Sequence, residues 1–193
     1  AVNRSRASCS GSVANSAPPP LGGGRGLAGG ALPEPPPRPA RPTPPAGEPD
    51  CRRIAAAISA ALPGRPAVGI AAVGAGRLES GGAASNSRAH LLEDTQLIHL
   101  GGPVRDAAAG GRPILVADMA LETQWDNDFR REVQMLGARS LFCQPVTAAS
   151  EVVGVITLYG SRPNAFHAAA PDLLRPFRVT VTDALIRLHT SER

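Results

Sequence analysis

Residues 139–159 read Arg-Ser-Leu-Phe-Cys-Gln-Pro-Val-Thr-Ala-Ala-Ser-Glu-Val-Val-Gly-Val-Ile-Thr-Leu-Tyr. Two runs rich in apolar and β-branched residues, 139–146 and 152–159, enclose a short connection at 147–151. Runs of this length predict strands, and so short a connection predicts that the strands pair antiparallel. The stretch therefore predicts a hairpin and, with it, an antiparallel sheet.

Three segments upstream also have the character of strands. Ala67–Val73 is a run of small and β-branched residues, and Gly74-Ala75-Gly76 predicts a turn into a weaker strand over 77–85. The segment Pro113–Ala117, with the sequence Pro-Ile-Leu-Val-Ala, predicts a further strand.

Helical patterns separate these strands. Asp50 and Asp126 are predicted to cap the helices that follow them. The predicted helices span residues 50–62, 87–100, 103–109, 126–136 and 171–189. The order of helices and strands predicts an α+β fold in which helices cover an antiparallel sheet.

The first 49 residues differ in composition from the rest of the chain. Pro18-Pro19-Pro20 precedes Gly22-Gly23-Gly24, and a Pro-rich stretch follows up to Pro49. Such a segment has too little apolar surface to offset its ordering entropy. We expect residues 1–49 to be a disordered linker or tail, rather than a Pro-rich ligand of another domain, and residues 50–193 to form one folded domain.

Charge and cysteine usage exclude several classes of protein. The net charge is +4, and all 20 basic residues are Arg, but residues 49–193 hold 15 Arg against 14 acidic residues. This balance argues against a direct nucleic-acid partner. No apolar run is long enough for a membrane helix. Three scattered cysteines without zinc-site spacing predict reduced thiols, no metal site and a cytoplasmic location.

Several segments, in order and at compatible spacing, resemble the GAF domain family, in particular the GAF modules of actinobacterial regulators. They are Leu100–Ala107, which contains Gly-Pro-Val-Arg-Asp-Ala, then Gly111–Asp118, Trp125, Gly137–Ser140, Pro145-Val146, Gly154–Tyr159, Ala165-Phe166 and Leu173–Phe177. The resemblance covers residues 50–193. It implies a GAF/PAS-like antiparallel sheet of about six strands flanked by helices.

The resemblance also implies a ligand pocket between the sheet and the loops around the third strand. In this sequence the pocket would lie at about 104–125, facing 139–143, and no cofactor is implied. The candidate ligand-binding residues are Val104, Asp118, Met119, Trp125, Phe142 and Cys143. For Trp125 a role in closing the core is favoured over ligand stacking, and for Asp118 a local turn bond is favoured.

The last predicted helix carries an apolar stripe with spacings of three and four. The stripe consists of Leu174, Phe177, Val181, Ala184 and Leu188. This spacing is typical of a dimer seam. It equally fits a helix that packs on its own sheet.

These patterns predict a non-catalytic sensor or regulatory domain that binds a small molecule or a partner protein in signal transduction. We expect an effector protein in trans, since Arg193 follows directly on the last helix, and a homodimer through the terminal helices. One alternative is a dimerisation or interaction module without a ligand. The other is a thiol-dependent reductase of the free methionine sulfoxide type that uses Cys143.

Overall fold

The central element of the fold is the hairpin of β5 (Ser140–Ala148) and β6 (Glu151–Gly160). The computed structural model describes residues 48–79, 82–167 and 170–191. Ala149 and Ser150 join the two strands with φ of +46° and +71°. Positive φ at both central residues makes the two-residue turn whose twist matches that of the paired strands. The predicted hairpin is confirmed.

The other strands extend this hairpin on both sides. They are β1 (Ala67–Gly74), β2 (Arg77–Leu78), β3 (Ala83–Ala84) and β4 (Ile114–Val116). The order in the sheet is β2-β1-β6-β5-β4, with β3 paired to β1, and all pairs among the described strands are antiparallel. The antiparallel sheet of five to six strands agrees with the prediction.

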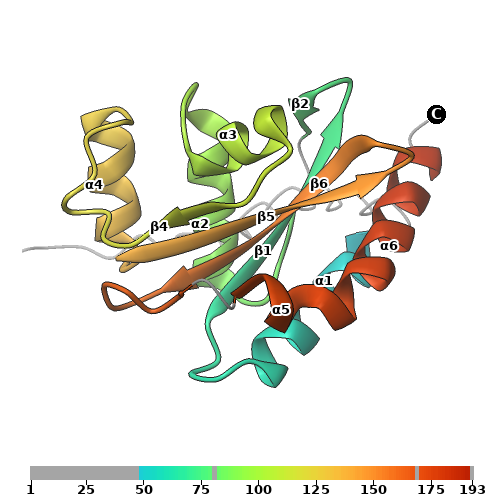
Figure 1. The fold of residues 1–193 in the computed structure, drawn as a ribbon, viewed down its shortest axis with the longest axis horizontal. Helices are drawn as coiled ribbons and strands as arrows, with labels where there is room; N and C mark the ends of the chain where they lie inside the picture. The colour runs from blue at the N-terminus through green and yellow to red at the C-terminus, as the bar shows by residue number, and fades with distance from the viewer. Residues whose placement is uncertain (1–47, 80–81, 168–169, 192–193) are drawn as a thin grey trace, which may run out of the picture. The chain divides into compact units, whose positions relative to one another are not determined.

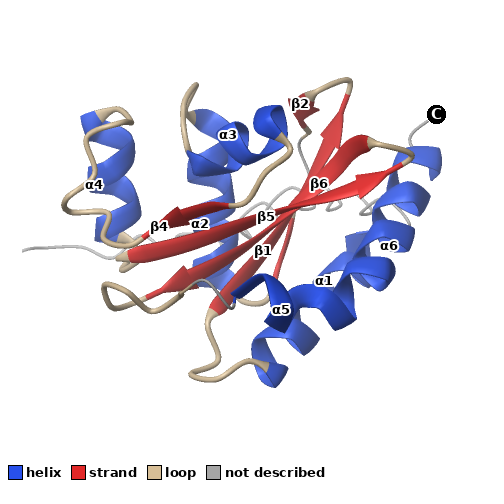
Figure 2. Cartoon of the chain, in the orientation of Figure 1, coloured by secondary structure: helices blue, strands red, loops and turns tan. Residues whose placement is uncertain are grey.

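Helices cover both faces of the sheet, which separates them into two layers (Figure 1). One layer contains α1 (Glu48–Ala61), α5 (Ala170–Leu174) and α6 (Arg178–Ser191). The other contains α2 (Ser87–Ile98), α3 (Pro103–Gly110) and α4 (Asn127–Met135). Figure 2 shows the strands running between these two groups of helices. Because both faces are covered, β1 and β5 are buried almost continuously instead of alternating.

Three predicted elements differ from the structure. The single strand predicted over 77–85 is replaced by the two short strands β2 and β3. Helix α1 begins at Glu48, so Asp50 lies inside its first turn, where its carboxylate accepts a hydrogen bond from Arg53 instead of capping the helix. The single helix predicted over 171–189 is divided into α5, a 3-10 turn at Arg175–Phe177, and α6. Pro176 explains the division, since it lacks the N–H that an α-helix needs at that position.

The apolar stripe of the terminal helices lies in the core of its own domain. Leu174, Val181, Ala184 and Leu188 are at most 3% exposed, and the half-buried Phe177 packs on the same core. This core also contains side chains of α1 and of the sheet. The residues proposed as a dimer seam are thus occupied within the chain, as the alternative of packing on its own sheet requires.

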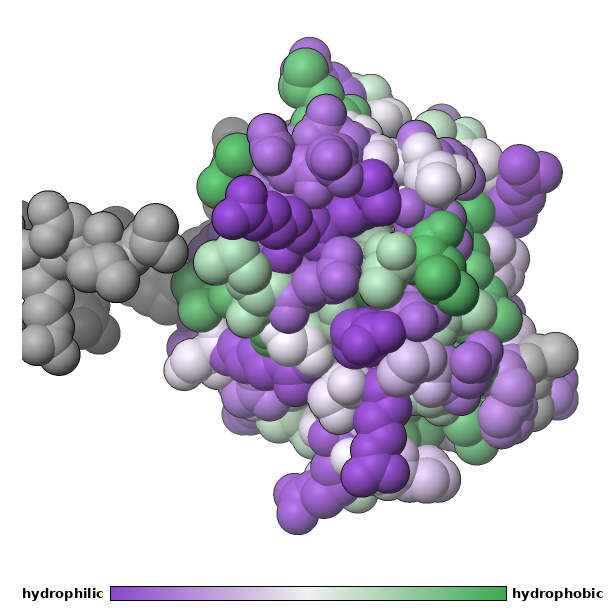
Figure 3. Space-filling model, turned by 90° about the vertical axis from the view of Figure 1, so that its left-hand side faces the viewer, coloured by the Kyte–Doolittle hydropathy of each residue, from purple (hydrophilic) through white to green (hydrophobic). Residues whose placement is uncertain are grey.

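Two of the other expectations concern the tail and the membrane. Residues 1–47 of the predicted tail lie outside the described residues, while Glu48 and Pro49 belong to α1. Across the described helices, none combines the length and the apolar character needed to cross a bilayer. At the α4 end of the domain, Figure 3 shows a surface that is largely hydrophilic, with apolar residues in separate groups.

Helix α6 packs directly against the sheet at Gly154 of β6. A Cβ atom there would lie 2.4 Å from Leu185 Cδ1 and 2.6 Å from the Ala71 carbonyl oxygen. We expect Gly154→Ala to lower the free energy of unfolding by about 2–3 kcal/mol, because α6 has to move away from the sheet. Urea unfolding measures this loss. Gly101→Ala is the control, since its Cβ would meet only Trp125, at 4.0 Å, and a loss of equal size there would contradict the account.

Candidate functional site

Three strands contribute one row of small or polar residues to the face that α2 and α3 cover. Gly69 of β1 is paired with Thr157 of β6, and Thr157 is paired with Cys143 of β5. Residues directly opposite each other in adjacent strands share a face of the sheet. Cys143 packs with side chains of α3, which fixes this face as the one beneath α2 and α3.

Glu93 of α2 reaches down onto this row. A Cβ at Gly69 would lie only 1.8 Å from Glu93 Oε1, so the glycine provides the space that the carboxyl group occupies. Glu93 is 6% exposed, and its Oε1 accepts a hydrogen bond of 2.6 Å from the hydroxyl of Tyr159. Tyr159 is itself fully buried on β6.

The protonation of this pair is governed by burial. Burial raises the pKa of Glu93 from 4.5 to about 7, while the Tyr159 hydrogen bond acts in the opposite direction. Burial, followed by the negative charge of Glu93, raises the pKa of Tyr159 well above its ordinary value. Tyr159 therefore stays a hydrogen-bond donor, and Glu93 can exist in both forms near neutral pH.

Beside this pair lie buried polar atoms that make few hydrogen bonds. Gln96, one turn after Glu93 on α2, is 1% exposed, and among the described residues its amide makes no hydrogen bond of good geometry, although it lies close enough to Tyr159 to act on the pKa of that hydroxyl, in the lowering direction. The Thr157 hydroxyl likewise makes no hydrogen bond of good geometry to a described residue, although it lies beside the Cys143 thiol and acts to lower the pKa of that thiol. An unpaired buried polar group costs about 1–3 kcal/mol. We refer to Glu93, Gln96, Cys143, Thr157 and Tyr159 together as the polar cluster.

A small cavity of about 50 Å³ lies beneath α2 beside the polar cluster. Glu93 and Gln96 form part of its wall, together with Ala71 of β1, Leu78 of β2 and Gly82. This volume admits one or two water molecules or a ligand with very few heavy atoms. Any larger ligand has to displace α2 or its neighbours.

A much larger hollow, of about 660 Å³, lies at another end of the sheet between the β1–β2 turn, α3 and α6. Its lining is mainly apolar. His189 is among its lining residues, and its Nε2 lies 3.1 Å from Glu79 Oε2. We place the candidate site at the polar cluster, where the buried carboxyl group of Glu93 and the amide of Gln96 wall a cavity.

The structure does not gather the six predicted ligand-binding residues into one site. Val104, Met119, Trp125 and Cys143 are buried on the α2–α4 side of the sheet, whereas Phe142 belongs to the core on the α1–α6 side. Adjacent residues of a strand point to opposite faces, so Phe142 and Cys143 cannot share a pocket. None of the described cavities is lined by any of the six residues.

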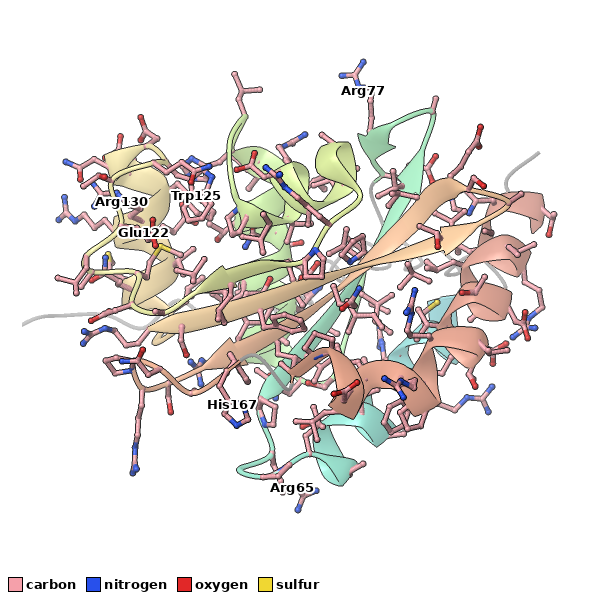
Figure 4. The ribbon with its side chains drawn as sticks, viewed as in Figure 1. Arg65, Arg77, Glu122, Trp125, Arg130 and His167 are labelled. Atoms are coloured by element: carbon pink, nitrogen blue, oxygen red, sulfur yellow. The ribbon has the colours of Figure 1, made fainter. Side chains whose placement is uncertain are left out.

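Asp118 and Trp125 have structural partners. Asp118 accepts two-pronged hydrogen bonds of 2.9 Å from Arg139, which hold the pKa of Asp118 below its usual value. The Trp125 indole N–H donates to Asp106 at 2.8 Å and the ring stands edge-on to Phe129. Figure 4 shows Trp125 beside Arg130, whose guanidinium donates to the Trp125 carbonyl at 3.1 Å. The roles favoured from the sequence, core closure and local bonding, agree with these contacts.

Sequence reasoning missed Glu93, Gln96, Thr157 and Tyr159. The available signal was on α2, where the helix buries Glu93 and Gln96 but leaves Leu91 51% and Ile98 73% exposed. A helix that turns polar residues inward and leucine outward departs from ordinary amphipathic patterning. Only the pairing of β1 with β6 reveals what the inward residues face.

The chain belongs to the GAF domain family, because the model of that family matches residues 35–185. Its fold is similar to a GAF domain/HD domain protein from Geobacter sulfurreducens, with a TM-score of 0.55, 8% identity, and coverage of 76% of this chain and 94% of the other. It is also similar to a domain assigned to a two-component sensor histidine kinase protein of Sinorhizobium meliloti 1021, with a TM-score of 0.54, 17% identity, and coverage of 74% and 92%.

A third similar structure is that of an enzyme. The type II free methionine-R-sulfoxide reductase from Thermoplasma acidophilum has a TM-score of 0.55, 13% identity, and coverage of 72% of this chain and 92% of the other. Identities this low show a common fold only. No curated protein sequence matches the chain significantly. The GAF fold supports a sensing or regulatory role in general.

The raised pKa of Glu93 predicts a pH-dependent stability. The folded chain holds the proton of the Glu93 carboxyl group more tightly than the unfolded chain does. Protonation of Glu93 therefore stabilises the fold fully below pH 4.5, and this stabilisation is lost as the pH rises through about 7. We expect the free energy of unfolding of the wild type, taken relative to Glu93→Gln, to fall by roughly 3 kcal/mol across that range.

Urea unfolding of both proteins at several pH values measures this difference. Asp118 and Glu132 have lowered pKa values and act in the opposite direction at acid pH. They are present in both proteins and cancel in the comparison. A difference that does not change with pH would show that Glu93 is not a buried titrating group.

Proposed function

We propose that the chain is a non-catalytic GAF sensor domain that binds a small polar molecule at the polar cluster. The observation that carries the proposal is the cavity walled by Glu93 and Gln96, beside which the Gln96 amide and the Thr157 hydroxyl make no hydrogen bond of good geometry to a described residue. A ligand with a hydrogen-bond donor for the Gln96 carbonyl, an acceptor for its N–H₂ group and a group for the Glu93 carboxyl would satisfy them. Without a ligand, these atoms reduce the stability of the domain.

Helix α2 is the element through which binding would be transmitted. At its first turn, Arg88 donates to the Leu136 carbonyl at 2.8 Å, just beyond the end of α4. At its other end, Arg105 of α3 donates to the carbonyls of Leu97 and His99, each at 2.7 Å. A ligand too large for the 50 Å³ cavity displaces α2 and, through these bonds, biases α3 and α4. A sensor needs such a difference between its bound and free arrangements.

The output is proposed to pass to an effector protein in trans. A homodimer also stays a prediction, and it would have to use residues other than the buried stripe of α5 and α6. The exposed apolar residues of α6, Val179 and Ile186, are 71% and 43% exposed and are available for such contacts.

The test of the binding site compares two buried threonines whose hydroxyl groups differ in their hydrogen bonding. The Thr157 hydroxyl has only a weak contact with the Cys143 thiol among the described residues, whereas the hydroxyl of the equally buried Thr95 bonds to the Leu91 carbonyl and to Glu132, each at 3.0 Å. In ligand-free protein we expect Thr157→Val to raise the free energy of unfolding by about 1–2 kcal/mol and Thr95→Val to lower it by a similar amount.

Native mass spectrometry of gently purified protein supplies the functional half of the test. Wild type and Thr95→Val should retain a non-covalent small molecule, and Thr157→Val should lose it. If Thr157→Val instead destabilises ligand-free protein as much as Thr95→Val does, the hydroxyl has a structural partner and the proposal fails.

A thiol-dependent reductase is the second candidate, since one of the similar structures is a methionine sulfoxide reductase. Two observations weigh against it here. Burial raises the pKa of the Cys143 thiol far above its ordinary value, and the thiolate is the nucleophile in such chemistry. The other described cysteine, Cys51, lies in the core on the opposite face of the sheet.

We expect Cys143 to be inert to alkylation in the native protein. Treatment with iodoacetamide, followed by peptide mass spectrometry, should leave Cys143 unmodified in buffer and modify it fully in urea, because the side chain is 0% exposed. Modification of native Cys143 at the rate of a free thiol would support the reductase hypothesis.

A further inference from the structure

A hollow of about 630 Å³ lies between the α1–β1 loop, the first turn of α2 and the loop that follows β6. Three arginines line it, one from each of these segments, and none of its lining residues is acidic: they are Arg65, Arg88 and Arg162. We refer to this hollow as the basic groove. It is separate from the cavity beside the polar cluster, which shares no lining residue with it.

The guanidinium groups of the basic groove are poorly neutralised. Arg65 and Arg162 are exposed, and neither forms an ion pair or a side-chain hydrogen bond with any residue in the described ranges. Arg88 is half-buried and is held in place by the carbonyls of Leu136 and Gly137. Asp118, an acidic residue just after β4, forms an ion pair with Arg139, so its charge is already balanced outside the groove.

The loops that carry these arginines are held in one shape. Arg65 and Asn164 have φ of +46° and +53°, a region that non-glycine residues rarely occupy. Ser59 donates to the Pro66 carbonyl at 2.7 Å, and Ser140 donates to the Arg162 carbonyl at 2.8 Å. Asn164 N–H donates to the Ala117 carbonyl at 2.7 Å. A groove fixed in this way avoids much of the ordering cost of binding.

We propose that the basic groove binds a phosphate-bearing small molecule. Guanidinium groups match the oxygens of phosphate with paired hydrogen bonds, and three arginines are among the residues that line this one hollow. The volume lies within the range of small-molecule sites. Phe166 and the prolines Pro63, Pro66 and Pro163 give the groove apolar wall for the rest of such a molecule.

A small molecule fits the distribution of charge better than RNA or a membrane does. Those partners need a broad basic face, but the folded part of the chain has nearly equal numbers of arginines and acids. Here the positive charge is concentrated around a hollow. Tyr159 is among the residues that line this groove, and its hydroxyl donates to Glu93, so one residue belongs to both the basic groove and the polar cluster.

The test measures the binding of pyrophosphate to the full chain by isothermal titration calorimetry. We expect Arg65→Ala/Arg162→Ala to weaken binding about tenfold or more, because two charge-assisted contacts are removed. Arg77→Ala is the matched control: Arg77 is exposed, has no partner in the described ranges and lies far from Arg65 (Figure 4). It should change binding less than twofold.

Backbone amide chemical shifts of the wild type provide a readout that does not need the variants to fold. Added pyrophosphate should shift residues 64–67 and 160–166 and leave the β1–β2 turn unchanged. Absence of binding at millimolar pyrophosphate, equal weakening by Arg77→Ala, or groove-dependent binding of RNA or anionic vesicles without pyrophosphate binding would each overturn the proposal. Thr157→Val should leave pyrophosphate binding intact, which separates this site from the polar cluster.

Discussion

The hydrogen bond from Tyr159 to Glu93 is the contact on which the rest of the structure depends. It joins α2 to the central strand β6 in a fully buried setting, at 2.6 Å. It can form only because Gly69 leaves the carboxyl group room above β1. A carboxyl group so deeply buried is costly unless it is hydrogen-bonded or protonated, and here both solutions are open to it. The interior of the domain is thus polar at the place where an ordinary core would be apolar.

The sequence predicted the architecture because periodicity and turn chemistry are local. The hairpin of β5 and β6 and the Asp126 cap, which accepts from Asp128 N–H, both follow from neighbouring residues. The two wrong helix predictions, at Asp50 and Pro176, are local as well. Distant residues decide the stripe of α5 and α6, which fitted a dimer seam and packing on its own sheet equally well, and the position of α6 on β5 and β6 shows what the stripe packs against within the chain.

The candidate site could not be predicted for the same reason. Glu93 and Gln96 on α2 are separated by about sixty residues from Thr157 and Tyr159, and the register of β1 against β6 brings them together. The residues of the predicted pocket were chosen because they lie near the family's third strand in the sequence. That choice placed Phe142 and Cys143 in one site, although their side chains face opposite sides of the sheet. The resemblance predicted the fold correctly. The residues of the candidate site were instead identified from the burial of their polar side chains in the structure.

The most direct test of the central claim is a high-resolution crystal structure of the purified chain, examined at Gln96 and Thr157. The account predicts non-protein density larger than a water molecule within hydrogen-bond distance of the Gln96 amide and the Thr157 hydroxyl, enclosed beneath α2, and ordered water alone would contradict it. A Gln96 side chain rotated onto protein groups, with the cavity closed and the Thr157 hydroxyl bonded to the backbone, would contradict it.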